Sequence, residues 1–433
     1  MRLFLLVFIL LQTALAAPVP KGGDWPRKTV SFQQVIDAAL TRNLDLAAAT
    51  QRVQLDERRW EAERERQLPS LSVGAGFSHV DGRKQGSFGD FQSVDFNRSE
   101  GGIGIEWRLN PGERWHAAQS AHYEYEQSRS EHRDAQQQLL FRTAELYQAL
   151  LLGKRRVEIA TQRLVNDDAI ITTVKARIQA GRASEDDLLR AQSQRALHHA
   201  GMISIRHLWI QASIEVARIL RWPVPILLEP EENTPAAWEI PTIPTGLHPE
   251  IEAAEAEVAS AREKREEALW KLFGPEVDVR VQGLLLGKHP GDLSAGERYR
   301  AALTWRLSAG EWQDIRARDM ALALAATRLQ RTREAVEAER NAALEATESA
   351  RLRWQEIAAA MDALEKTVKL ADARYRAGRA LLIELLDAEK RLFEARLRAA
   401  EALRDYNLAQ VRYLSASGQL DRHTLLQMAG GEQ

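Results

Sequence analysis

Acidic side chains gather beside two Gly-Arg pairs of this chain, Gly181-Arg182 and Gly378-Arg379. The acids are Glu185, Asp186, Asp187, Glu384 and Asp387. Carboxylates in the first turn of a helix offset the helix dipole, which explains Glu185 and Asp186. Asp187, Glu384 and Asp387 follow their glycine by six or nine positions, deeper than we expect that effect to reach. These three are candidates for an electrostatic site, beside the alternative that they too are helix-end charges.

Other patterns that could support chemistry are incomplete. Cysteine is absent, which excludes disulfides, thiolate metal sites and Cys nucleophiles. Gly153-Lys154 lacks the upstream glycine of a phosphate loop, and Gly102-x-Gly104 lacks a third glycine. Six histidines fall on charged helical stretches without an H-E-x-x-H motif, and we interpret them as solvated: His116, His122, His132, His198, His199 and His207. The sequence therefore predicts no catalytic, cofactor or metal site and no enzyme.

The beginning of the chain predicts export. Met1-Arg2 precedes an apolar stretch over residues 3–11, and Ala14-Leu15-Ala16 supplies a small-residue cleavage site. We interpret residues 1–17 as a signal peptide, too short for a membrane anchor. The rest of the chain has no long apolar run, and we expect no transmembrane helix. A net charge of −2 implies no nucleic-acid partner.

The two Gly-Arg pairs belong to an internal duplication. Gly181-Arg182 matches Gly378-Arg379 at an offset of 197, and Leu188-Leu189 matches Leu385-Leu386 at the same offset. A dense match at one fixed offset indicates a repeat. Because glycine supplies the backbone conformation that ends a helix, each copy predicts the tip of a helical hairpin.

Apolar and polar residues alternate with a period of two in four segments, which predicts strands over residues 71–80, 101–109, 276–286 and 298–307. A polar, Gly-rich loop is expected over 81–99. In a water-soluble sheet the apolar face would pack on a core; in a membrane barrel it would face lipid, with the charged face toward water. No further amphipathic element remains to cover these strands, which favours the barrel. Four strands cannot enclose water, so a barrel requires several chains. Trp107 and Trp305 lie near strand ends, where interfacial aromatics are expected.

Heptad-spaced apolar residues predict long helices over about 112–180 and 310–377, each on the order of 100 Å long. A first helix is expected from Ser31 to about Gln67, after a flexible entry over 18–30. We divide the chain into a first repeat (18–220), a Pro-rich linker (221–246), a second repeat (247–417) and a C-terminal tail (418–433).

This organisation resembles the TolC-like outer-membrane efflux protein family over essentially the whole mature chain. The matching motifs are His248-Pro249-Glu250-Ile251, Leu68-Pro69-Ser70-Leu71, Tyr375-x-x-Gly378, Leu385-Leu386-Asp387-Ala388 and Asp405-Tyr406. The chain departs from the family at Asn43-Leu44, where Asn-Pro is usual. It also has Asn110-Pro111-Gly112 and Ser308-Ala309-Gly310 where Pro-Leu-Phe often precedes the long helix.

The resemblance implies a homotrimer in the outer membrane of a Gram-negative bacterium. Its mainly helical chains would contribute four strands each to a 12-stranded β-barrel, continued by a helical barrel in the periplasm. It implies a passive export duct of a tripartite efflux or type I secretion system, opened by a periplasmic adaptor and an inner-membrane pump of the RND or ABC type. No cofactor is implied.

The resemblance also assigns residues. Asp187, Glu384 and Asp387 would form an acidic ring at the periplasmic mouth, with Tyr375 and Arg379 as links that hold it shut. The hairpin tips would contact the adaptor, through Gly181, Arg182, Ala183, Gly378, Arg379 and Ala380. The alternative is a periplasmic coiled-coil adaptor or tethering protein, but an adaptor would carry one hairpin, a lipoyl-like domain and a membrane anchor. The exported cargo is not determined by the sequence.

Overall fold

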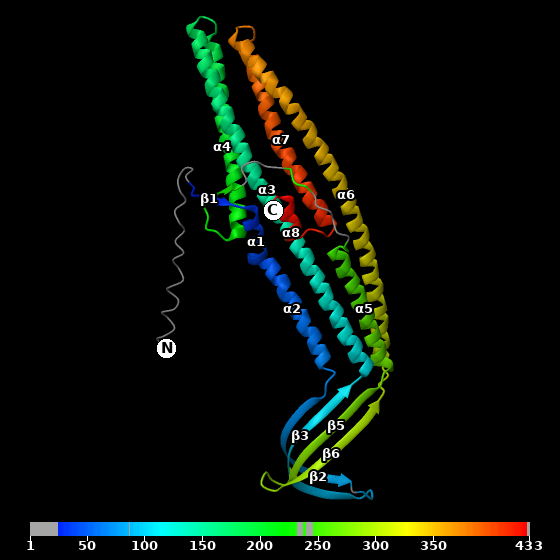
Figure 1. Ribbon diagram of the computed structural model, residues 1–433. Helices are drawn as coiled ribbons and strands as arrows, with labels where there is room; N and C mark the ends of the chain where they lie inside the picture. Colours follow the sequence, from blue (N-terminus) through cyan, green and yellow to red (C-terminus); the bar gives the residue numbers. More distant parts are fainter. Residues whose placement is uncertain (1–24, 86, 232–236, 240–245, 431–433) are drawn as a thin grey trace, which may run out of the picture. The chain divides into compact units, whose positions relative to one another are not determined.

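The computed structural model describes residues 25–85, 87–231, 237–239 and 246–430 and is mainly helical (Figure 1). The predicted signal peptide lies outside these residues. The chain forms two compact units: unit 1 comprises Met1–Leu44, Gln136–Thr245 and Glu339–Gln433, and unit 2 comprises Asp45–Ala135 and Gly246–Ala338. Each unit takes residues from both sequence repeats. Within the described part of the chain, no helix has the length and apolar character needed to cross a membrane.

Unit 1 combines a two-stranded sheet with helices. Its elements are β1 (Arg27–Val30), α1 (Phe32–Arg42), α4 (Glu185–Leu220), β4 (Leu227–Pro230), α7 (Leu382–Ala416), α8 (Arg422–Met428) and the C-terminal parts of α3 (Pro111–Gln179) and α6 (Ala309–Arg376). β1 pairs with β4 in parallel, with Val30 opposite Pro230. The flexible entry and the Pro-rich linker expected from the sequence therefore each contain a strand. Pro230 is tolerated because it stands at the end of a strand in a two-stranded sheet, where few ladder donors are needed.

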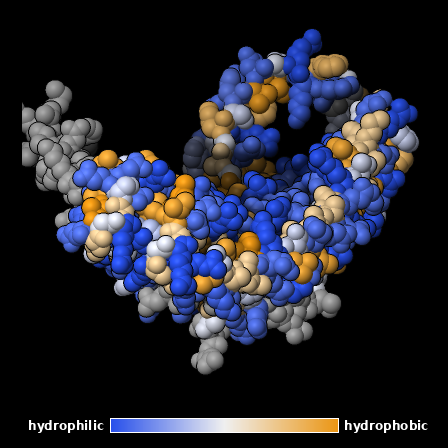
Figure 2. All heavy atoms as spheres, turned by 90° about the horizontal axis from the view of Figure 1, so that it is seen from above, coloured by the Kyte–Doolittle hydropathy of each residue, from blue (hydrophilic) through white to orange (hydrophobic). Residues whose placement is uncertain are grey.

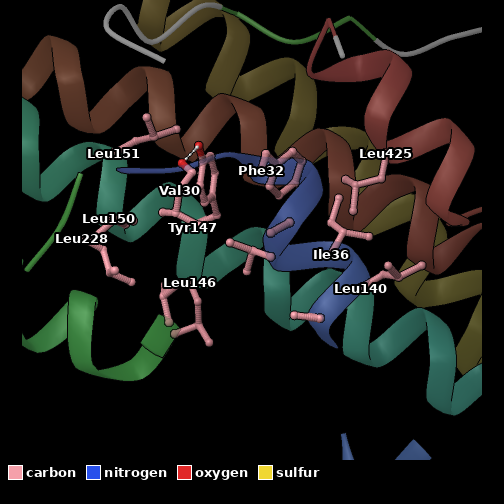
Figure 3. Close-up of a cluster of buried hydrophobic side chains, with 14 of the residues drawn as sticks. Val30, Phe32, Ile36, Leu140, Leu146, Tyr147, Leu150, Leu151, Leu228 and Leu425 are labelled. Carbon is pink, nitrogen blue, oxygen red and sulfur yellow. Dashed lines mark hydrogen bonds between the residues drawn. The ribbon is translucent and has the colours of Figure 1, made fainter. Parts of the chain in front are cut away.

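The main hydrophobic core of unit 1 forms around α1 (Figure 3). The Phe32 ring stacks on the rings of Tyr147 and Trp238, with centroids 4.8 and 5.4 Å apart. The Tyr147 hydroxyl donates to the Val30 carbonyl at 3.4 Å, so the buried phenol has a polar partner. Ile36, Leu150 and the other labelled side chains of Figure 3 complete this cluster.

The first helix is interrupted, contrary to the expectation of one helix from Ser31 to about Gln67. The Ser31 hydroxyl accepts from the Gln34 N–H at 3.3 Å and caps α1 as expected. Asn43 then adopts an extended conformation (φ −72°, ψ 129°), and α2 (Leu44–Glu65) begins after it. The periodicity continues across this break because a single non-helical residue leaves the apolar spacing nearly unchanged.

The expected C-terminal tail contains a helix that packs into the core. Asp421 caps α8 by accepting from the Thr424 N–H at 2.7 Å. Leu425 and Leu426 are buried in the main cluster. Arg422 donates to Asp37 of α1 at 2.7 Å. The C-terminal residues therefore fix α1 rather than extend into solvent.

Two helical hairpins, α3–α4 and α6–α7, have their turns at the same end of unit 1 (Figure 1). Gly181 and Gly378 have positive φ values of 66° and 75°. In each turn the next residue donates back five positions, Arg182 N–H to Arg177 O and Arg379 N–H to Arg374 O, both at 2.8 Å. This is the Schellman arrangement that glycine permits without steric cost, as the sequence predicted for both tips.

Unit 2 contains α2, α5 (Pro249–Phe273), the N-terminal parts of α3 and α6, and a four-stranded antiparallel sheet in the order β2-β3-β5-β6. The strands are β2 (Ser70–Gln85), β3 (Phe91–Leu109), β5 (Glu276–Gly287) and β6 (Leu293–Thr304). Most of the loop expected over 81–99 is strand. The sequence missed it because the alternation inverts there: Val80 lies on the same face as Ser72, while His79 lies on the face of Val73.

The sheet has an apolar face and a polar face. Period-two alternation and the strand register place large apolar side chains on one face, and all of these are exposed: Leu71, Val73, Phe77, Ile103, Ile105, Val281, Leu285, Tyr299 and Leu303. Val73, for example, is 76% exposed. The polar face carries Ser70, Ser72, Gly74, Glu106, Arg280, Gln282, Arg298 and Arg300. An apolar face of this size left uncovered is unusual for a water-soluble sheet.

Candidate functional site

The tips of the two hairpins form a joint hydrophobic cluster. Tyr375 of α6, only 3% exposed, packs with Val174 of α3 and with Leu382 and Leu385 of α7. Partly buried residues of α3 and α4, including Leu188, complete the cluster. Tyr375 and Leu385 belong to motifs that the sequence singled out. The tips therefore do not stand as separate hairpins within one chain.

Arg177 ties this cluster together through two backbone carbonyls. Its Nη1 donates to the Tyr375 carbonyl, and its Nη2 donates to the Arg182 carbonyl at 3.1 Å. Its guanidinium also lies 4.4 Å from the centroid of the Tyr375 ring. One side chain thus holds the turn of the first hairpin against the last turn of α6. Sequence reasoning missed Arg177; its signals were its place four residues before Gly181 and its match to Arg374 at the repeat offset of 197.

The Tyr375 hydroxyl is buried and, in the described part of the chain, has no hydrogen-bond partner. Burial raises the pKa of Tyr375, the nearby Arg177 opposes that rise, and the negative charge of Asp187 adds to it. A buried tyrosine hydroxyl usually bonds to something, so this atom is available to a further partner.

The structure contradicts the expectation that Asp187 and Glu384 lie too deep in their helices to act as helix-end charges. The helices begin at Glu185 and Leu382, four residues after each glycine, so Asp187 and Glu384 lie in the first turn. Asp187 and Ser184 form a capping box, with the Asp187 carboxylate 3.3 Å from the Ser184 nitrogen. These two acids therefore do have local helix-end roles, and depth in the helix does not distinguish them from Glu185 and Asp186.

Glu384 and Asp387 make weaker local contacts than Asp187. Glu384 accepts from the Leu381 N–H at 3.2 Å, but leucine offers no hydroxyl to complete a capping box. Asp387 lies beyond the first turn and pairs with Arg391 at 2.9 Å, with both side chains more than half exposed. Within one chain, none of the described hydrogen bonds or ion pairs joins Asp187, Glu384 and Asp387 to one another.

The other tip residues lie on the exposed turns. Arg182 and Gly378 are exposed, and Ala183 and Ala380 are half-buried. In the described structure the Arg379 side chain has no ion-pair partner, and the guanidinium beside the Tyr375 ring is that of Arg177. Figure 2, viewed from the end of Figure 1 that carries the tips, shows mostly hydrophilic residues with smaller hydrophobic patches between them.

A buried polar network crosses the hairpins further along α3, and it corrects the expectation that all six histidines are solvated. His198 Nδ1 lies 2.7 Å from Asp167 Oδ2, with both side chains largely buried. Asn166 donates to the Glu389 carboxylate at 3.3 Å, which joins α3 to α7. The Arg163 guanidinium lies 4.1 Å from the Phe393 ring centroid, and burial lowers the pKa of Arg163.

Burial also affects the carboxyl groups of this network. It raises the pKa of Glu389, which the bond from Asn166 and the charges of Arg396 and Arg163 partly oppose, while Asp167 adds to the rise. Glu365 of α6 shows the opposite effect, because a hydrogen bond from Arg396 at 2.9 Å lowers its pKa.

On the sheet, acids and arginines form a cross-strand ion-pair ladder on the polar face. Arg280 binds Glu106 at 2.8 Å and Asp278 at 3.0 Å. Arg108 pairs with Asp278 at 3.2 Å. The ladder satisfies these charges while leaving the face hydrophilic, opposite the exposed apolar face.

The two tryptophans assigned to the sheet ends differ. The Trp107 indole donates to the Gln67 carbonyl at 2.8 Å, at the junction of α2 and the sheet. Trp305 lies one residue beyond the end of β6, which starts and ends earlier than predicted, and is 57% exposed. Both lie at the end of the sheet from which the helices continue.

Comparison with known proteins identifies the fold. Residues 35–220 match the model of the outer membrane efflux protein family. The chain is similar to CusC, with 17% identity, coverage of 89% of this chain and 92% of that chain, and a TM-score of 0.78. It is similar to the outer membrane protein VceC of Vibrio cholerae (14% identity, 89% and 96% covered, TM-score 0.77).

A third similar structure is the open state of the MtrE outer membrane channel of Neisseria gonorrhoeae, with 21% identity, 90% of each chain covered and a TM-score of 0.74. A search of curated protein sequences finds no match. The family model covers the first repeat, and the structural similarity extends over both. Residues 35–220 thus resemble the outer membrane efflux protein family, and the chain as a whole has the fold of these solved outer-membrane proteins.

Proposed function

We propose that this protein is the passive outer-membrane duct of a tripartite efflux or type I secretion system. The single observation that carries the proposal is the four-stranded sheet, which exposes an apolar face on one side and a charged, ion-paired face on the other. Lipid is the occupant that suits the first face, and water suits the second. Energy for export comes from the partners.

The open edges of the sheet support assembly from several chains. In the described structure, β2 and β6 are each paired on one side only. An unpaired edge in a membrane exposes backbone donors and acceptors that hydrocarbon cannot satisfy. Three copies joined β6 to β2 would form a closed barrel of 12 strands, and the pore would lie along the polar faces. Trp107 and Trp305 are its interfacial aromatics.

The hairpin tips are the proposed mouth and adaptor contact. Asp187, Glu384 and Asp387 from three chains would form an acidic ring. The helix-end roles of Asp187 and Glu384 do not conflict with this, because a capping carboxylate keeps its charge. Tyr375 and Arg177 hold the tips together within each chain; Arg379, exposed beside them, would link neighbouring chains. A periplasmic adaptor would bind the turns at Gly181 and Gly378, and an RND or ABC pump would supply cargo.

The adaptor alternative is disfavoured because the chain carries two hairpins and a four-stranded sheet with an exposed apolar face, and its fold is that of outer-membrane channels. Membrane fractionation and bilayer recording test the proposal. The protein should be recovered from the outer membrane only with detergent, and it should form ion-conducting pores in planar bilayers. A soluble periplasmic monomer that never conducts would overturn it.

A further inference from the structure

Two arginines on the polar face of the sheet stand apart from its ion-pair ladder. Arg298 and Arg300 lie two residues apart on β6, on the same face and about 7 Å apart along the strand. Both are exposed, and among the described residues neither has a carboxylate within ion-pairing distance. The charged groups nearby are already paired: Arg280 binds Glu106 at 2.8 Å, and Glu100 binds Arg98 at 3.0 Å.

The strand register places no carboxylate directly opposite either arginine on β5. Arg300 lies directly opposite Arg280, and Arg298 lies opposite Gln282. Like charges opposite one another destabilise a strand pair. Arg280 is compensated by Glu106 and Asp278, but Arg300 is not. Arg300 therefore keeps a positive charge that no carboxylate of the described structure neutralises, and such a group can bind an anion.

The proposed assembly would not supply the missing negative charge. The strand that joins β6 in a closed barrel is β2 of a second copy. Whatever the register, the polar face of β2 over residues 70–78 contributes only serine and glycine: Ser70, Ser72, Gly74, Gly76 and Ser78. These residues add hydroxyl groups and space but no carboxylate. The two guanidiniums therefore stay uncompensated from both sides.

A groove on the same face provides room for a ligand. It has a volume of about 430 Å³ and is lined by Arg298, Gln282, Ser72 and several glycines, as well as by Glu100 and Glu106. Arg300, two residues further along β6 on the same face, is not one of its lining residues. Both acids are already bound, Glu100 to Arg98 at 3.0 Å and Glu106 to Arg280. The volume lies within the range of small-molecule sites. Gly102 and Gly104 have no side chains, which leaves space at the bottom of the groove. A Cβ on Gly104 would meet the Gln282 side chain at 2.8 Å.

We propose that Arg298 and Arg300 form a binding site for multivalent oxyanions, with phosphate or sulfate groups, on the inner wall of the duct. Guanidinium groups bind such oxyanions through paired N–H donors. The location on the inner wall rests on the proposed barrel. Three copies would place six such guanidiniums around the duct, which would bind multivalent anions locally at the level of the sheet.

The test compares wild type with the double variant Arg298→Gln, Arg300→Gln and the control Arg83→Gln. Arg83 is also an exposed arginine of the sheet without an ion pair in the described structure, but it lies on the opposite face. Inorganic tripolyphosphate is the probe. Its binding to detergent-solubilised protein is measured by calorimetry at low salt, and its block of the current is measured in planar bilayers.

Wild type and the control should bind the probe, and the double variant should bind it at least about tenfold more weakly, because two charge-assisted contacts are lost. Block should weaken in parallel, and both effects should fade near 1 M salt, where the screening length is about 3 Å. Equal binding by all three proteins, or an equal loss in the control, overturns the inference. If the double variant loses binding but wild type forms no pore in planar bilayers, the result supports the anion site and contradicts the proposed duct.

Discussion

Arg177 shows how one side chain can fix the geometry of the two hairpin tips without belonging to a recognisable motif. Its acceptors are the carbonyls of Tyr375 and Arg182, and its face lies over the Tyr375 ring. Tyr375 could be predicted from its Tyr-x-x-Gly motif. Arg177 could not, because backbone acceptors leave no mark in the pattern of side chains, and 59 lysines and arginines give no reason to prefer one.

Replacing Arg177 by alanine should loosen the tips. Each hydrogen bond from a charged donor contributes about 1.5–3 kcal/mol, and two are lost. Amides of residues 371–386 should exchange with solvent faster, by at least about tenfold, while the main core around Phe32 stays protected. Hydrogen exchange with mass spectrometry measures both regions. Tyr375→Phe is the control. The Tyr375 hydroxyl has no hydrogen-bond partner in the described chain, so this variant should exchange like wild type. Faster exchange of residues 371–386 in this variant would indicate a bond between the hydroxyl and a neighbouring chain.

The acidic residues require a test that separates charge from capping. In the triple variant Asp187→Asn, Glu384→Gln and Asp387→Asn, the amide oxygens can still accept the capping bonds, but the charges are gone. We expect weaker cation preference of the reconstituted pore and weaker block by multivalent cations, because crowded carboxylates concentrate cations. Both effects should fade at high salt.

The matched control for this variant is Glu185→Gln with Asp186→Asn, which removes first-turn charges from the same tip. It should alter helix-end stability and leave the reversal potential unchanged. Identical reversal potentials for the triple variant, the control and wild type would show that Asp187, Glu384 and Asp387 act only as helix-end charges.

At the scale of elements, the network between α3 and α7 makes stability depend on pH. Burial holds the pKa of Glu389 above its ordinary value of 4.5, so the folded state binds this proton more tightly than the unfolded state. The stability that protonated Glu389 contributes to the folded state is fully present below pH 4.5. It is lost as the pH rises through the pKa of Glu389 in the folded protein. At neutral pH the ionised Glu389 therefore costs stability.

Glu389→Gln should raise the melting temperature at about pH 8 and change it little at about pH 4. Glu365→Gln should instead lower the melting temperature at about pH 8. Because Arg396 lowers the pKa of Glu365, the stability that ionised Glu365 contributes is present above pH 4.5 and is lost as the pH falls through its pKa in the folded protein. Circular dichroism melts of the detergent-solubilised protein measure both variants. A gain for Glu389→Gln that persists unchanged at acidic pH would show that titration of Glu389 is not its cause.

The elements that the sequence predicted well are those with long periodic patterns. Heptad spacing recurs in α3 and α6, helices of 69 and 68 residues, often enough to outweigh local exceptions, and the two glycine turns have a direct stereochemical cause. The elements it missed are short. β1, β4 and α8 have four to seven residues each and are stabilised by contacts with residues distant in sequence, such as Arg422 with Asp37. Such contacts leave no local period.

At the scale of the whole molecule, the same order of elements occurs twice: helix, two strands, long helix and return helix, as α2-β2-β3-α3-α4 and α5-β5-β6-α6-α7. This supports the duplication proposed from the sequence. The division into units could not be predicted from it, because each unit is formed by corresponding segments of the two copies. A repeat that cannot bury its own apolar surface is completed by its neighbour, and in the proposed barrel the sheet would be completed by other chains.

The edges β2 and β6 therefore predict a trimer that can be trapped covalently. The chain contains no cysteine, so engineered thiols have no competing partners. Ser72→Cys on β2 is combined with one cysteine at a time on β6, either on the polar face (Gly296, Arg298, Arg300 or Ala302) or on the apolar face (Ala295, Glu297, Tyr299 or Ala301). Disulfides need Cβ atoms about 3.5–4.5 Å apart, so only one or two polar-face positions should link.

Oxidation in the membrane should convert those variants into a species of three times the chain mass on denaturing gels, because each chain would link to two neighbours. The apolar-face series serves as the control, since its side chains point to the other side of the sheet. Cross-linking that stops at dimers would show that the sheets do not close into a ring. Linking at all eight positions alike would show random collision rather than a strand register, and neither result is compatible with a 12-stranded barrel.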